Sequence, residues 1–162
     1  MTELEVGSVM AQLINYNNEE FDSTVVGLLA ATVAEECLSL PGGIQASDGG
    51  REINPGCCCG LEEWREWLEC PTSGRSSTMG HDPFPWIEWA EDIGNGSPDS
   101  NAFTIAFERE RFVAQLERVE RELRAFLLRV EAWAEAVGFP DPPALCRRLD
   151  ACFGITEPVV AE

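Results

Sequence analysis

The chain has 162 residues, of which 44% are hydrophobic and 25% are charged, and its formal net charge is −18. This length suits one domain that buries most of its unfolded surface, and the ordinary hydrophobic content argues against disorder. Residues 1–50 carry eight acids and no base, and residues 51–101 carry ten acids and three arginines. The first 101 residues therefore hold −15 of the net charge, which creates a field that repels nucleic acid and anionic lipid.

The N-terminal third is expected to form a strand, a helix and a loop. Residues 4–16 fit a strand and a helix about equally, and we favour the strand. Its alternate positions hold Leu4, Val6, Met10, Ile14 and Tyr16. A helix is predicted over 23–38, because Asp22 or Ser23 can accept hydrogen bonds from its first amides. The stretch 41–55 is rich in glycine, which predicts a mobile loop.

The middle of the chain is expected to hold a short helix, a second loop and a hairpin. Residues 61–69 place their apolar side chains on one helical face. Residues 71–80 are rich in Ser, Thr and Gly, which predicts another mobile loop. Two alternating stretches, 86–93 and 102–108, flank a Gly-Asn-Gly-Ser-Pro-Asp sequence and so predict an antiparallel hairpin.

The C-terminal third predicts one long helix over 109–137 and a shorter one over 142–153. Apolar residues recur in the long helix at alternating four- and three-residue spacings, namely Phe112, Leu116, Val119, Leu123, Phe126, Val130, Trp133 and Val137. Gly138 is a natural helix stop, and Asp141 can cap the helix that follows. Because residues 102–139 are nearly neutral, we interpret the long helix as a scaffold.

These elements predict a single α+β domain over residues 1–162. A small antiparallel sheet, made of 4–16, 86–93 and 102–108, would pack on the four predicted helices.

Three adjacent cysteines, Cys57 to Cys59, and the single histidine, His81, are the one group of residues that suggests chemistry. A zinc site of Cys57, Cys59 and His81 is one alternative, because zinc accepts thiolate and imidazole ligands. A second is nucleophilic catalysis, in which a helix N-terminus lowers the thiol pKa of Cys58 or Cys59 and His81 acts as base. The third is structural, with free cysteines acting as small hydrophobes. We favour this third interpretation and expect neither a catalytic nor a metal site.

The residues around these cysteines carry a resemblance. Pro55 to Trp67 (PGCCCGLEEWREW), followed by Gly80 to Glu88 (GHDPFPWIE), resemble a segment shared by small acidic bacterial proteins of no known activity. The resemblance covers under a quarter of the chain and implies a bacterial origin. It assigns no functional residue.

The charge distribution favours a module that binds a basic protein surface, as inhibitors and immunity proteins do. We expect its contact surface to consist of acids outside the long helix, with exposed tryptophans among them as anchors. The predicted contact acids are Glu62, Glu63, Glu66, Glu88, Glu91 and Asp92. The alternatives are the thiol or zinc site above, and a structural protein that self-assembles as a homodimer through 109–137.

The expected location is the cytoplasm. Residues 1–6 are acidic and lack the basic start of a signal peptide, and the longest largely apolar run, 25–34, is too short to span a bilayer. In such a chain we expect the seven cysteines to be thiols or ligands rather than disulfides. We expect no enzymatic activity.

Overall fold

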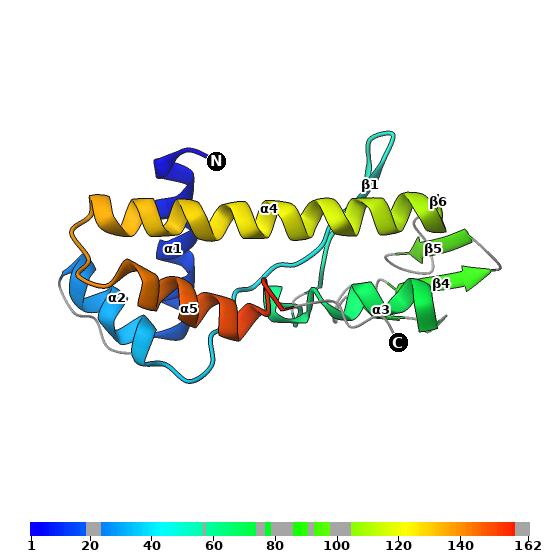
Figure 1. Cartoon of the computed structure of the whole chain (residues 1–162). Coiled ribbons are helices and arrows are strands. Elements are labelled where there is room, and N and C mark those ends of the chain that lie inside the picture. Colours follow the sequence, from blue (N-terminus) through cyan, green and yellow to red (C-terminus); the bar gives the residue numbers. More distant parts are fainter. Residues whose placement is uncertain are drawn as a thin grey trace. The chain divides into compact units, whose positions relative to one another are not determined.

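The structure is a computed structural model that describes residues 1–18, 24–56, 58–73, 77–78, 86–90, 93–97 and 105–157. The chain is an α+β protein whose longest element is helix α4 (Arg109–Ala136) (Figure 1). It divides into two compact units. Unit 1 consists of Met1–Leu40 and Glu120–Glu162, and unit 2 consists of Pro41–Val119, so that α4 contributes to both. The single domain expected over 1–162 stays a prediction.

Helix α1 (Glu3–Asn17) occupies the segment for which we predicted a strand over 4–16, and that prediction was wrong. The helix begins with a capping box, in which the Thr2 side chain accepts a hydrogen bond from the Glu5 backbone and the Glu5 carboxylate accepts one from the Thr2 backbone. The box satisfies two backbone donors that would otherwise lack partners. The buried side chains follow one helical face and are Val6, Met10 and Leu13.

Helix α2 (Val25–Ala34) is shorter than the helix predicted over 23–38. It ends because the backbone becomes extended at Glu35, with φ −64° and ψ 137°. The carbonyl oxygens near this end accept hydrogen bonds from Arg148, whose Nε lies 3.1 Å from the Val33 oxygen. An arginine from the last helix thus serves as the C-terminal cap of α2.

Helix α5 (Pro142–Phe153) has the predicted boundaries. Asp141 accepts a hydrogen bond from the Ala144 amide at 3.0 Å, and Gly154 ends the helix in the left-handed conformation. The Cys146 thiol lies 3.4 Å from the Leu127 carbonyl oxygen and thereby links α5 to α4. The largest fully buried side chains of unit 1 come from all four helices and from the segment after α5, and are Val6, Met10, Leu13, Leu29, Thr32, Val130, Leu145, Leu149 and Ile155.

Unit 2 opens with an antiparallel hairpin of β1 (Ala46–Asp48) and β2 (Arg51–Ile53), within the stretch for which we predicted a loop. That prediction was wrong for these residues. Gly49 and Gly50 have φ of 55° and 89°, the positive values that a two-residue hairpin turn requires. The hairpin also buries Ile53 completely, so the segment contributes to the core.

The helix predicted over 61–69 consists of two pieces. A 3₁₀ turn, η1 (Leu61–Glu63), precedes helix α3 (Glu66–Ser73), which extends into the predicted loop 71–80. Arg109 at the start of α4 donates a hydrogen bond from Nη1 to the Pro71 carbonyl and so joins the end of α3 to α4.

A four-stranded antiparallel sheet completes unit 2, in the order β3-β4-β5-β6. Its strands are Ser77–Thr78, Trp86–Ala90, Ile93–Ser97 and Ile105–Glu108. We expected Gly94 to Gly96 to be a loop between two paired strands, but these residues form β5, so β4 and β6 each pair with β5 rather than with each other. The glycines suggested a turn, yet their backbone groups take part in the strand ladder. Strand β3 lies within the predicted loop 71–80.

Candidate functional site

The cysteine loop is joined to the segment that enters unit 2. The Gly42 amide donates to the Cys59 carbonyl at 3.1 Å, the Cys59 amide donates to the Gly56 carbonyl at 3.2 Å, and Pro41 forms a β-bridge with Gly60. Cys58 is exposed and Cys59 is half-buried. Cys57 and His81 lie outside the described residues.

The Cys59 side chain packs against the core of unit 2. That core consists of Ile53, Trp67, Ile105 and Leu116. Burial raises the pKa of the Cys59 thiol to about 11, and the neighbouring Glu63 carboxylate acts in the same direction. The thiol is therefore almost entirely protonated at neutral pH. A protonated thiol is a poor nucleophile, because the thiolate is the reactive form.

Among the described residues, no cluster of three or more His, Cys, Asp or Glu side chains is arranged to hold a metal ion. The Cys70 thiol lies 3.4 Å from the Glu66 carbonyl oxygen, within its own helix, and is buried. Among the described cysteines, the side chains of Cys37, Cys58, Cys59, Cys70, Cys146 and Cys152 are thiols and form no disulfide.

The predicted contact acids lie in unit 2. Glu66 is exposed, and Glu62 and Glu63 are half-buried, along η1 and the start of α3. Glu88 lies on β4, whereas Glu91 and Asp92 fall outside the described residues.

The tryptophans of this segment are not exposed anchors as we expected. Trp64 and Trp67 are only 1% and 6% exposed. Their burial holds η1 and α3 against the rest of unit 2. The Arg65 guanidinium lies 5.3 Å from the centre of the Trp64 ring and covers it. The tryptophans anchor the acidic segment to its own unit, in which Glu66 is exposed whereas Glu62 and Glu63 are half-buried and the Glu63 carboxylate neighbours the Cys59 thiol.

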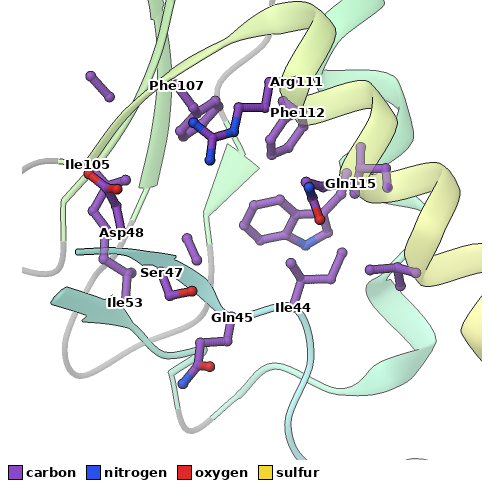
Figure 2. A pocket seen from close by; sticks show the side chains of 15 residues that line it. Ile44, Gln45, Ser47, Asp48, Ile53, Ile105, Phe107, Arg111, Phe112 and Gln115 are labelled. Atoms are coloured by element: carbon purple, nitrogen blue, oxygen red, sulfur yellow. The ribbon is translucent and has the colours of Figure 1, made fainter. Parts of the chain in front are cut away.

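A second feature of unit 2 is a cavity of about 420 Å³ that the sequence did not predict. It lies between the β1–β2 hairpin, strand β6 and the first turns of α4, as Figure 2 shows. Its volume falls within the range of roughly 300–1,000 Å³ that is typical of small-molecule pockets. Among the described residues, the lining is formed by Ile44, Gln45, Ala46, Ser47, Asp48, Ile53, Trp67, Ile105, Ala106, Phe107, Arg111, Phe112, Gln115, Leu116 and Val119.

Three aromatic rings dominate one wall of the cavity. Phe107 and Phe112 are stacked, with centroids 4.9 Å apart and planes at 16°, and the Trp67 ring lies 6.3 Å from Phe112 at 40°. The sequence placed Phe107 on a strand face and Phe112 on the helical stripe, but gave no reason to bring them together. The β1–β2 hairpin forms the wall opposite these rings. The Gly49-Gly50 pair, which favours a two-residue hairpin turn, was the sequence feature from which that hairpin could have been predicted.

In comparisons with known proteins, no family model, no curated protein and no solved structure matches the chain. Within the described ranges, none of the helices combines the length and the apolar character needed to cross a membrane.

Proposed function

We propose that this protein is an acidic protein-binding module, of the inhibitor or immunity type, that recognises a basic protein surface. The observation that carries the proposal is the segregation of charge, because the first 101 residues hold −15 of the net charge of −18. Such a field accelerates encounter with a basic partner and selects against nucleic acid.

The η1–α3 segment supports the proposal because it presents acids on a fixed support. Its tryptophans are buried and hold the segment against unit 2, while Glu66 is exposed and Glu62 and Glu63 are half-buried. A rigid acidic surface loses less conformational entropy on binding than a mobile loop. We include Glu88, Glu91 and Asp92 in the proposed surface on sequence grounds alone.

The remaining aspects of the proposal concern location and assembly. The thiols of the described cysteines suit a reducing compartment, which supports a cytoplasmic location.

Self-association of two copies through α4 is a second proposed arrangement of the protein. It is favoured by Leu128, a large apolar side chain that is 69% exposed on that helix. Sedimentation at several protein concentrations measures this directly, and a concentration-independent monomer would rule it out.

The test compares two variants with equal loss of charge. In the first, Glu62→Gln, Glu63→Gln and Glu66→Gln are combined. In the control, the exposed acids of α4 are neutralised by Glu110→Gln, Glu117→Gln and Glu135→Gln. Wild-type protein and both variants are immobilised, exposed to native lysate at low salt, and eluted in steps of rising salt.

We expect wild type and control to retain the same basic proteins and to release them steeply with salt, because exposed charge pairs are screened. The first variant should lose these proteins. Equal retention by both variants, or elution that does not depend on salt, would refute the proposal.

A further inference from the structure

We propose that the cavity of unit 2 binds a small aromatic molecule that carries one carboxylate. This inference is separate from the protein-binding function, since none of the acids Glu62, Glu63 and Glu66 lines the cavity, although Trp67 of α3 does. Its basis is the combination of an aromatic wall, a volume of about 420 Å³ and one cation at the rim.

The aromatic wall determines the shape of the ligand. The Phe107 and Phe112 rings stack on each other, and Trp67 lies beside them. Flat apolar rings favour offset or edge contacts with another flat ring, which gains more from such a wall than a branched aliphatic chain does. Ile53 and Ile105 are buried at the opposite side and exclude water from it.

The cation determines the charge of the ligand. Arg111 extends from α4 toward Phe107 at the edge of the cavity, as Figure 2 shows. Among the interactions of the described residues, Arg111 takes part in no hydrogen bond or ion pair. Arginine presents two parallel donors that match a carboxylate, so a guanidinium left without a protein partner is suited to an anionic ligand.

Two further groups at the rim restrict the ligand. Asp48 also lines the cavity, and it lies opposite Arg51 in the register of the hairpin. Its negative charge opposes a second anionic group at the hairpin side, so the ligand should carry one acid only. Gln115, one helical turn beyond Arg111, points toward the same space and offers a neutral hydrogen-bonding group (Figure 2).

The test uses 2-naphthoate and its neutral analogue 2-naphthamide as probes, with isothermal titration of the full chain at physiological salt. The two probes have nearly the same shape and differ in charge. Arg111→Gln is compared with Arg121→Gln, which removes the same charge from an exposed position of α4 that does not line the cavity. A third variant, Gln115→Trp, fills the cavity from an exposed position and so does not disturb the core.

We expect wild type to bind one equivalent of 2-naphthoate and to prefer it to the amide by about tenfold, the scale of one hydrogen bond to a charged group. Arg111→Gln should abolish this preference and leave binding of the amide unchanged, Arg121→Gln should behave as wild type, and Gln115→Trp should weaken both probes.

Three results would overturn the proposal. They are the lack of saturable binding by either probe, a wild-type affinity for the amide that equals that for the carboxylate, and equal effects of the two arginine variants. The last result would show that only the overall charge matters. Circular dichroism of each variant verifies that the fold is retained.

Discussion

The Cys59 thiol should react slowly with alkylating reagents at neutral pH. Burial raises its pKa to about 11, with the Glu63 carboxylate as the second cause. A cysteine with the ordinary pKa of 9.0 is roughly one tenth thiolate at pH 8, whereas a pKa of about 11 leaves about one part in a thousand. Because the thiolate is the nucleophile, this difference alone slows the reaction roughly 100-fold.

Part of this loss is recovered because a thiolate of higher pKa is more nucleophilic. With a Brønsted coefficient of about 0.4–0.5, the gain is roughly six- to tenfold, so Cys59 should react at least about tenfold more slowly than an exposed cysteine at pH 8. The charged form is disfavoured in the folded protein, so the rate should rise about tenfold for each pH unit and continue to rise beyond pH 9, where an ordinary thiol levels off.

The assay uses a protein with Cys57→Ser and Cys58→Ser, so that Cys59 is the one thiol of its loop. Timed exposure to iodoacetamide between pH 7 and 11, followed by mass spectrometry of the peptide, gives the rate at this residue. Adding Glu63→Gln should shift the profile to lower pH, whereas Glu66→Gln should leave it unchanged, because Glu66 is not a cause of the shift. A rate that levels off below pH 9 would refute this reasoning and revive the thiolate hypothesis.

Two further predictions concern the packing of unit 1. Leu145→Ala should lower the free energy of unfolding by about 2–5 kcal/mol, because Leu145 is fully buried and leaves a cavity. Urea denaturation measures this, and the neighbouring Arg147→Ala, at an exposed position, should change it by no more than about 0.5 kcal/mol. Arg148→Ala should cost about 1–2 kcal/mol, because the Val33 carbonyl loses the Arg148 donor and the Glu36 carbonyl keeps only the weak Cys152 thiol donor. Hydrogen exchange should then accelerate at the last turn of α2, and equal effects of both arginine variants on this turn would contradict the capping role.

The elements that could be predicted are those in which local and tertiary signals agree. Helices α4 and α5 have nearly the expected boundaries, because their apolar periodicity coincides with a cap at Asp141 and with glycine stops. Helix α1 was missed because Leu4 and Tyr16 completed a strand pattern. These two side chains are 82% and 61% exposed, so they are apolar without belonging to the buried face of the segment. The Thr2-x-x-Glu5 sequence was the better signal.

The cavity could not be predicted because its walls come from segments far apart in the chain. Ile44 and Asp48 come from a glycine-rich stretch, Ile105 from the last strand and Arg111 from the long helix. Periodicity identifies a face within one segment, but not which faces oppose one another. The burial that raises the pKa of Cys59 could not be predicted for the same reason, because the core on which its thiol packs is assembled by residues from Ile53 to Leu116.

The division of the chain has a consequence for its synthesis. Unit 2 is one continuous stretch, Pro41–Val119, placed between the two parts of unit 1. A ribosome therefore releases α1 and α2 first, but α5, which packs on α2, emerges last. Until then, Leu29 and the other apolar side chains of the first two helices lack their final neighbours. Unit 2 can mature while it is being made, whereas unit 1 cannot be completed until unit 2 has been synthesised, and during this interval the apolar side chains of α1 and α2 are open to aggregation.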